Sequence, residues 1–168
     1  MQTIEKKSSL FNQVLMVIIS LLVVSAIAIT ITLVIPGGKA IFAGQRPTNL
    51  GIQAGKFAPC PSSPNCVSSF SQDAEHKIEP LVYNATPAEA MAQLKQVIQS
   101  LERTKIITAT DNYLYAEFTS ALMGFVDDVE FVLDDQKKVI QVRSASRLGD
   151  SDFGVNRKRI ETIREQLN

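Results

Sequence analysis

The chain has 168 residues, with 17 basic and 17 acidic side chains and therefore no formal net charge. Nucleic-acid-binding domains normally carry an excess of Lys and Arg, so this balance argues against a nucleic-acid partner. The length suits one globular domain once an apolar N-terminal segment is set aside.

That segment is an uncharged run from Val14 to Ile35, VLMVIISLLVVSAIAITITLVI. As a helix its 22 residues would span roughly 30 Å, the thickness of the hydrocarbon core of a bilayer. It lacks the polar stripe of a helix packed in a water-soluble domain. We therefore predict a single-pass transmembrane helix over residues 14–35, preceded by a cytoplasmic tail over residues 1–13.

A cleaved signal peptide is the alternative interpretation of this run. Signal peptides usually have a shorter apolar region and end at a small-x-small site, which IFAG at 41–44 matches poorly because Ile41 is large. Lys6 and Lys7 precede the run and favour a cytoplasmic N-terminus. The rest of the chain is then expected outside the cytoplasm, in a periplasm or a thylakoid lumen, where disulfides persist.

The next segment, residues 36–58, is rich in Gly and Pro and has no period of 2 or 3.6, so we expect a linker that continues as an irregular lid to about residue 76. The exported domain is predicted over 59–168. An edge strand is expected at 77–83, because Pro80 would disrupt a central strand. Thr86, Pro87 and Glu89 have the spacing of a capping box, which predicts a helix over 87–102.

Two hairpins and a closing helix follow. Strands at 104–110 and 112–120 flank the turn signal Asp111-Asn112, and strands at 125–134 and 137–147 flank Asp135-Gln136. Asp152 is the expected N-cap of a helix over 153–167. The fold class is therefore α+β, an antiparallel sheet of four to five strands with two helices packed on one face.

The second hairpin separates apolar from polar side chains. If Asp134 pairs with Lys137, Asp128 lies opposite Arg143 and Glu130 opposite Gln141, with Arg147 near the strand end. A one-residue slip would exchange the two faces. The polar face is then either a solvated surface of weak ion pairs or a binding surface where Arg143 and Arg147 hold a small anionic ligand. Its expected members are Tyr113, Tyr115, Glu117, Asp128, Glu130, Arg143 and Arg147.

Three polar residues share the parity of the core instead. Asp127, Ser144 and Ser146 lie toward the end of the hairpin that approaches the last helix. Buried polar groups need hydrogen-bond partners, so we expect either a buried capping network or a small anion pocket at the helix N-terminus.

The two cysteines, Cys60 and Cys66, lie in the segment PCPSSPNC with five residues between them. The predicted compartment favours a disulfide, which should contribute about 2 kcal/mol by closing this short loop. A metal site with His76 and a carboxylate, or a reactive cysteine beside His76, are the alternatives. Zinc knuckles and thioredoxin-like centres normally have a closer spacing, so no metal or cofactor is assigned.

Several motifs occur together and in order: PCPSSPNCVSS, His-x-Ile-x-Pro-Leu, YAEFTSALMGFVDDVEF and VIQVRSASRLGDSDFGVNRKRIE. Through them, roughly residues 46–167 resemble the DUF1499 family of proteins of unknown function. The resemblance implies a bacterial, cyanobacterial or plastid protein that is exported or membrane-anchored, and it implies no activity. The positions that recur in that family correspond here to Cys60, Cys66, His76, Asp127, Asp128, Glu130, Arg143, Ser144, Arg147, Asp152, Asn156 and Arg157.

Two hypotheses about function remain open. The first is a non-enzymatic module at the membrane surface that binds a protein partner or a small anionic ligand. The second is an enzyme of unrecognised class, with a polar site around His76, Asp127, Arg143 and Asn156. An enzyme should gather His76, Asp127 and an arginine in one pocket, whereas a binding module should leave the polar sheet face open or covered by the lid.

Overall fold

The computed structural model describes residues 2–34 and 42–167, with side chains described for 12–28 and 42–167. The chain forms two compact units, Met1–Lys39 and Ala40–Asn168. The first contains helix α1, Gln2–Val34. In the described part of the chain, no helix combines the length and apolar character needed to cross a membrane. The run predicted to do so ends at Ile35, which lies outside the described residues.

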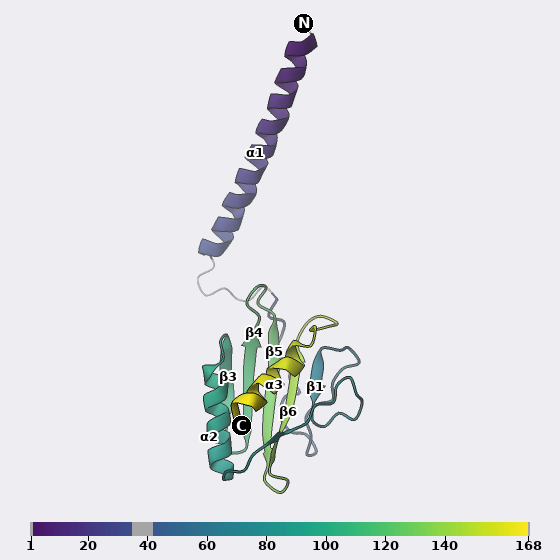
Figure 1. The fold of residues 1–168 in the computed structure, drawn as a ribbon, viewed down its shortest axis with the longest axis vertical. Coiled ribbons are helices and arrows are strands. Elements are labelled where there is room, and N and C mark those ends of the chain that lie inside the picture. The colour runs from purple at the N-terminus through teal and green to yellow at the C-terminus, as the bar shows by residue number, and fades with distance from the viewer. Residues whose placement is uncertain (1, 35–41, 168) are drawn as a thin grey trace. The chain divides into compact units, whose positions relative to one another are not determined.

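The second unit is an α+β domain built on one antiparallel sheet (Figure 1). Its helices and strands, in chain order, are β1 Cys66–Ser68, β2 Leu81–Val82, α2 Pro87–Ser100, β3 Thr104–Ala109, β4 Tyr113–Thr119, β5 Val126–Asp134, β6 Val139–Ser146 and α3 Val155–Leu167. The described residues from 42 onward that were expected to form a linker belong to this unit.

Strands β3 to β6 form a meander, and both β1 and β2 pair with the outer edge of β6. Strand β1 lies opposite Arg143 to Ala145, and β2 lies opposite Val139 and Ile140. The described part of the sheet thus has six strands, not the four to five predicted. The additional strand, β1, lies in the segment expected to be irregular, because its extended conformation depends on pairing with a distant strand and not on a local pattern.

The predicted ends of the two domain helices are largely confirmed. In α2 the backbone N–H of Glu89 donates to Thr86 Oγ1 at 3.3 Å, and the Glu89 carboxylate accepts from the backbone N–H of Thr86 at 3.0 Å. Helix α3 begins at Val155, two residues later than expected. Asp152 caps it by accepting hydrogen bonds from the backbone N–H groups of Gly154 at 2.9 Å and Asn156 at 2.7 Å.

The predicted register of the second hairpin is wrong by two residues. Asp134 pairs with Val139, so Glu130 lies opposite Arg143 and Asp128 lies opposite Ala145. The cause is a longer turn, which includes Lys138 at a φ of 54°. A shift of two keeps every side chain on its own face, and the predicted assignment of residues to the two faces is therefore confirmed.

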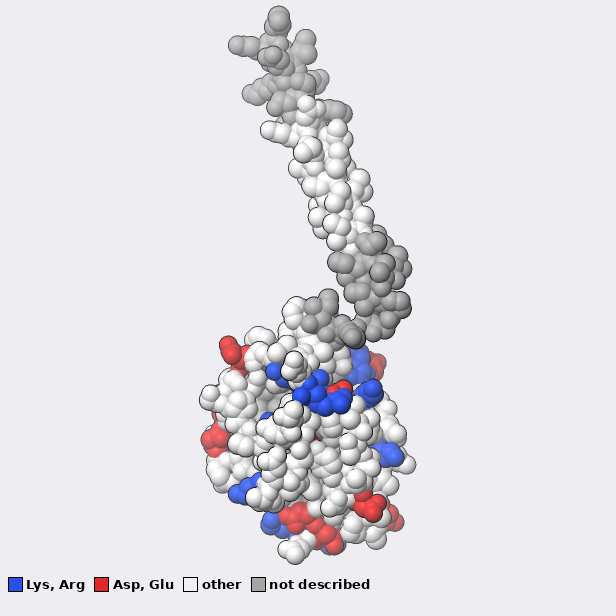
Figure 2. Space-filling model, turned by 180° about the vertical axis from the view of Figure 1, so that it is seen from behind, with Lys and Arg blue, Asp and Glu red and all other residues white. Residues whose placement is uncertain are grey.

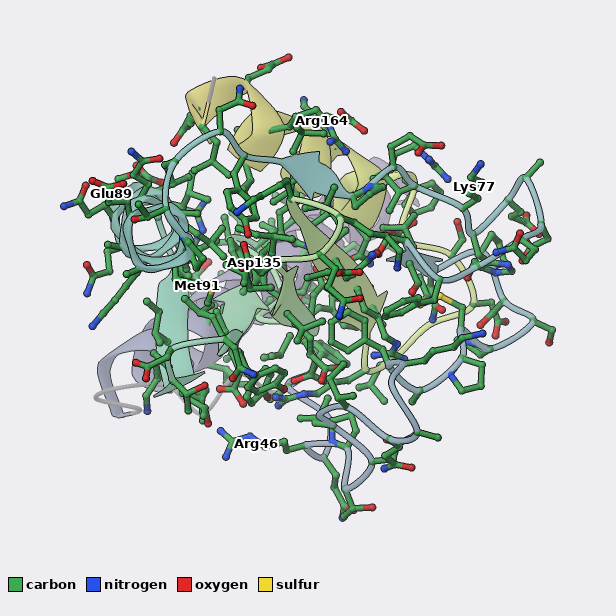
Figure 3. The ribbon with its side chains drawn as sticks, turned by 90° about the horizontal axis from the view of Figure 1, so that it is seen from below. Arg46, Lys77, Glu89, Met91, Asp135 and Arg164 are labelled. Atoms are coloured by element: carbon green, nitrogen blue, oxygen red, sulfur yellow. A yellow bond between two sulfur atoms is a disulfide. The ribbon has the colours of Figure 1, made fainter. Side chains whose placement is uncertain are left out.

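The apolar core lies between the sheet and the two helices. Strand residues such as Val129, Phe131 and Val142 pack there against Leu94 of α2 and Ile160 of α3, all fully buried. Seen from one end of the sheet, Arg164 of α3 and Arg46 of the N-terminal segment lie on opposite sides (Figure 3). The face of the sheet opposite the helices does not contribute to this apolar core.

Candidate functional site

The face of the sheet away from the helices carries a layer of polar side chains, which we call the polar layer. Strand alternation places them together, since residues i and i+2 of a strand share a face. Glu130 of β5 is flanked by Tyr115 of β4 and Arg143 of β6 in the strand register. The layer consists of Tyr113, Tyr115, Glu117, Asp128, Glu130, Arg143 and Arg147. Tyr113, Glu117 and Arg147 are partly exposed, and the other four are buried.

Residues 42–57, which we call the strap, run across this face. Arg46 Nε donates to Glu117 Oε1 at 2.8 Å, and Arg46 NH2 forms an ion pair with the same oxygen at 2.6 Å. The backbone N–H of Gly51 donates to Glu130 Oε1 at 2.6 Å. Phe57 is buried and its ring lies 5.5 Å from that of Phe70. Seen from the strap side, Lys and Arg side chains gather in the upper part of the domain, with an acidic patch among them (Figure 2).

Arg147 is the centre of the larger ion-pair network in the polar layer. Its Nε and NH2 donate to the two carboxylate oxygens of Asp128, at 2.9 and 2.7 Å. NH2 also contacts the carboxylate of Glu117, and it donates to the Tyr115 hydroxyl at 3.2 Å. The hydrogen bond with Asp128 raises the pKa of Arg147. Arg147 is thus hydrogen-bonded to partners inside the domain. Of the two arginines predicted to hold an anionic ligand, Arg143 is the one without such bonds to a carboxylate.

Glu130 and Arg143 form a second, less complete pair. Glu130 Oε1 accepts from the backbone of Gly51 and from the Tyr113 hydroxyl at 2.8 Å. Its other oxygen, Oε2, lies 3.6 Å from Arg143 NH1, which is too long for a hydrogen bond. Among the described residues, Glu130 Oε2 and Arg143 Nε are the buried side-chain atoms without a hydrogen-bond partner.

Burial dominates the electrostatics of this pair. Glu130 is 0% exposed, and burial raises the pKa of its carboxyl group despite the hydrogen bonds from Gly51 and Tyr113. Burial also lowers the pKa of Arg143, since the charged guanidinium has been removed from water. Both charges therefore carry a desolvation cost that the contacts within the domain offset only in part.

A separate polar cluster lies on the helix side of the sheet, where Asp127, Ser144 and Ser146 meet α3. Ser144 Oγ donates to Asn156 Oδ1 at 2.5 Å, and Asn156 Nδ2 donates to Ser146 Oγ at 3.0 Å. Arg159, which sequence reasoning missed, donates to Asp127 Oδ2 at 2.5 Å. Arg159 is three residues after Asn156, so both lie on the same face of the helix, and this spacing could have predicted that Arg159 joins the cluster. These contacts correspond to the buried-network alternative, in which the polar groups satisfy one another.

The lid segment contains the remaining predicted residues. Cys60 and Cys66 form a disulfide, as predicted, with their Cα atoms 5.6 Å apart. His76 is 7% exposed, and its ring nitrogens lie 2.7 Å from Asp73 Oδ1 and 3.2 Å from the carbonyl oxygen of Ser63. The Arg157 guanidinium donates to the carbonyl oxygens of Lys77 at 2.8 Å and Glu75 at 2.9 Å, joining the lid to α3.

The four residues of the predicted enzyme site are not brought together. Asp127 and Asn156 belong to the cluster on the helix side of the sheet. Arg143 lies in the polar layer on the other face, and His76 lies in the lid, where it contacts Asp73. Within the part of the chain that the structure describes, no three His, Cys, Asp or Glu side chains are grouped as a metal site. In the polar layer, by contrast, Glu130 Oε2 and Arg143 Nε are buried without a hydrogen-bond partner among the described residues.

A search of curated proteins finds no significant match to this chain. A family model, described as "Protein of unknown function (DUF1499)", matches residues 56–167 and so begins ten residues later than the resemblance suggested. The match covers every strand of the sheet, both domain helices and all of the polar layer, but little of the strap. The chain belongs to the DUF1499 family.

Proposed function

We propose that this chain is a membrane-anchored, exported domain that acts as a non-enzymatic binding module, with its ligand site beneath the strap. The main support for the binding site is that two buried side-chain atoms, Glu130 Oε2 and Arg143 Nε, have no hydrogen-bond partner among the described residues. Buried polar atoms are almost always hydrogen-bonded in folded proteins, so two such atoms on residues that pair across β5 and β6 are a reason to expect a ligand there.

The two atoms define the chemistry of the ligand. A carboxylate oxygen accepts hydrogen bonds and a guanidinium nitrogen donates them, so the complementary group must offer both a donor and an acceptor. A primary amide, a protonated carboxylic acid or the ammonium and carboxylate of an amino acid has this character. A simple anion fits less well, because the charge of Arg143 is already opposed by Glu130 and that of Arg147 by Asp128 and Glu117.

Access to this pair requires the strap to move. Two contacts attach the strap to the polar layer near the pair, from Arg46 to Glu117 and from the backbone of Gly51 to Glu130. Arg46 is half exposed, so its ion pair is screened by solvent and weak. A ligand that binds Glu130 Oε2 and Arg143 Nε therefore enters only when both of these contacts break.

The anchor rests on the uncharged run of residues 14–35. The polar side chains in its described part are internally bonded, since Ser20 Oγ donates to the carbonyl oxygen of Val17 and Ser25 Oγ to that of Leu21, both at 2.8 Å. Hydroxyl groups bonded to the helix backbone in this way reduce the cost of placing a helix in lipid. The side chains described in α1 are all exposed, which suits an apolar solvent around them.

The experiment that tests the binding site is purification of the full chain from its native membranes in mild detergent, followed by mass spectrometry of the native complex. We expect a small polar molecule at about one per chain, which the variant Arg143→Met loses. The matched control Arg103→Met removes an exposed arginine paired with Glu102 and should retain the molecule. Absence of any bound small molecule from the wild type, or equal retention by both variants, would overturn the proposed site.

A further inference from the structure

One end of the domain exposes an unusual number of large apolar side chains. They come from the start of the strap, the β4–β5 loop, and the β6–α3 loop with the first residue of α3, and we call them the apolar end. The residues are Phe42, Leu122, Met123, Leu148, Phe153 and Val155. Leu122 is 93% exposed and Phe153 is 94% exposed, so these two side chains contribute almost nothing to the packing of the domain.

The three segments lie at the same end of the sheet (Figure 1). The backbone N–H of Arg147, at the start of the β6–α3 loop, donates to the carbonyl oxygen of Val126, at the end of the β4–β5 loop. The ring of Phe42 stacks on that of Phe125 with centroids 5.2 Å apart. A Cβ atom on Gly44 would lie 3.1 Å from Leu148 Cγ, so the strap runs close against the third segment.

The β4–β5 loop has a defined shape that projects its apolar residues. Ser120 closes it by two hydrogen bonds with Phe125, one from its backbone N–H to the Phe125 carbonyl at 2.8 Å and one accepted by its hydroxyl at 2.9 Å. The N–H of Gly124 also donates to the Ser120 carbonyl, at 3.3 Å. Leu122 and Met123 therefore lie at the tip of a closed loop, pointing away from the core.

Phe153 is held in an unfavourable backbone conformation. Its φ of +53° lies in the left-handed region, where a bulky aromatic residue is strained and Gly or Asn would be preferred. The side chain is almost fully exposed, so its packing does not compensate for this strain, and the backbone N–H of Phe153 makes only a long hydrogen bond to Ser151 Oγ, at 3.3 Å.

We propose that the apolar end inserts shallowly into the surface of a lipid bilayer and so docks the exported domain on the membrane that holds its anchor. Phe42 is seven residues beyond Ile35, the last residue of the uncharged run, and seven residues span at most about 25 Å. If residues 14–35 form the proposed anchor, this short connection keeps the apolar end close to the lipid. The inference therefore rests on the proposed anchor. Apolar side chains on loop tips are suited to the boundary between headgroups and acyl chains.

The docking depends on apolar burial and not on charge. Asp150 and Asp152 lie in the same loop as Phe153, and they would repel an anionic lipid headgroup. The loop that carries Phe153 therefore has no excess of positive charge, although Lys and Arg side chains gather elsewhere in this part of the domain (Figure 2). Docking should then not require anionic lipids, and on neutral phosphatidylcholine it should be insensitive to salt.

The test uses the full chain in phosphatidylcholine vesicles, with a fluorophore on a single introduced cysteine. The native cysteines form a disulfide and do not react. Labels at Leu122→Cys and Phe153→Cys should be quenched by brominated lipid several-fold more than by aqueous iodide. A control label at Gln136→Cys, in the turn at the opposite end of the sheet, should show the reverse. Raising the salt concentration should change none of these results.

Iodide access to positions 122 and 153 equal to that at 136 would overturn the proposal. Protection of 122 and 153 without quenching by lipid, rising with protein density, would also overturn it and would indicate a second copy instead. Resistance to an alkaline carbonate wash reports the anchor separately. Protein that washes off refutes the anchor, whereas retained protein with exposed labels refutes only the docking.

The variant Phe153→Asn separates docking from folding. Asn tolerates a positive φ, so this variant should fold at least as stably as the wild type. It should nevertheless reduce lipid quenching of a label at position 122, because it removes the largest exposed apolar side chain of the loop. Unchanged quenching in a folded Phe153→Asn variant would contradict a role of Phe153 in lipid contact.

Discussion

His76 is the single histidine of the chain, and each of its ring nitrogens faces an acceptor. The Asp73 carboxylate and the Ser63 carbonyl oxygen can only accept hydrogen bonds, so both contacts are satisfied at once when both ring nitrogens carry protons. Burial alone would lower the pKa of His76, but these two partners outweigh it and raise the pKa. The lid is therefore stabilised most by the charged form of the ring.

This arrangement predicts a measurable pH dependence. A raised folded-state pKa means that the contribution of His76 to stability is complete below the unfolded value of about 6.5 and is lost as pH rises through the folded value. An NMR titration should show one histidine signal with a pKa above about 6.5. The variant Asp73→Asn should lower that pKa, whereas Glu79→Gln, which leaves the ring contacts intact, should not. A wild-type pKa below the unfolded value would contradict this account.

At the scale of single elements, local patterns predicted structure well where the stabilising contacts are local. Thr86 and Glu89 are three residues apart, and their reciprocal capping bonds were predicted with the helix they begin. Strand alternation likewise fixed the face of Glu130 and Arg143, but not their pairing, because a register shift of two leaves the alternation unchanged. The turn at 135–138 decided the register, and its length was not apparent from Asp135-Gln136.

Elements that depend on distant partners were not predictable in the same way. Strand β1 has three residues and is extended because it pairs with β6. The strap has no period at all, and it is ordered by contacts such as that of Gly51 with Glu130, 79 residues later. The sequence therefore identified the polar layer, but it could not show that another segment covers the layer. Nor could it show that Arg147 is hydrogen-bonded to carboxylates whereas Arg143 forms only a looser ion pair with Glu130.

The disulfide offers a test of how the lid is stabilised. Cys66 begins β1, so the Cys60–Cys66 bond closes a short loop directly onto the sheet edge. The double variant Cys60→Ala/Cys66→Ala should lose about 2 kcal/mol in the free energy of unfolding, measured with denaturant. Adding a reductant should lower the stability of the wild type to a similar level and leave that of the double variant unchanged. If the wild type keeps its full stability after its disulfide has been completely reduced, the disulfide does not stabilise the lid.

At the scale of the whole domain, the two faces of one sheet are stabilised differently. The helix side is an apolar core, and the strap side is a set of ion pairs that joins three separate parts of the sequence, through Arg46, Glu117 and Arg147. Hydrophobic burial depends little on pH, whereas ion pairs depend on the charge of each carboxylate. Acid should therefore weaken the strap side before it weakens the core.

Glu117 is the residue that tests this difference. Burial alone would raise its pKa, but hydrogen bonds from Arg147 and Arg46 outweigh burial and lower it. A lowered pKa means that its stabilisation is present above the unfolded value of about 4.5 and is lost as pH falls through the folded value. Glu130 acts in the opposite sense, because its pKa is raised and its protonation in acid relieves a desolvation cost. The pH dependence of the wild type is a difference between the two, and a variant is needed to isolate Glu117.

We expect Glu117→Gln to lower the free energy of unfolding by about 1–3 kcal/mol at pH 7, since it removes charge-assisted hydrogen bonds. The loss should shrink as pH falls from about 4.5 through the lower folded value, because Glu117 of the wild type is protonated first in the unfolded chain and then in the folded domain. Hydrogen exchange should speed up in the strap at pH 7 more than in the β5 residues that face the core. The variant Glu102→Gln, which breaks the exposed pair with Arg103, serves as the control and should change little. If Glu117→Gln and wild type differ by the same amount at every pH, Glu117 does not stabilise the strap through its charge.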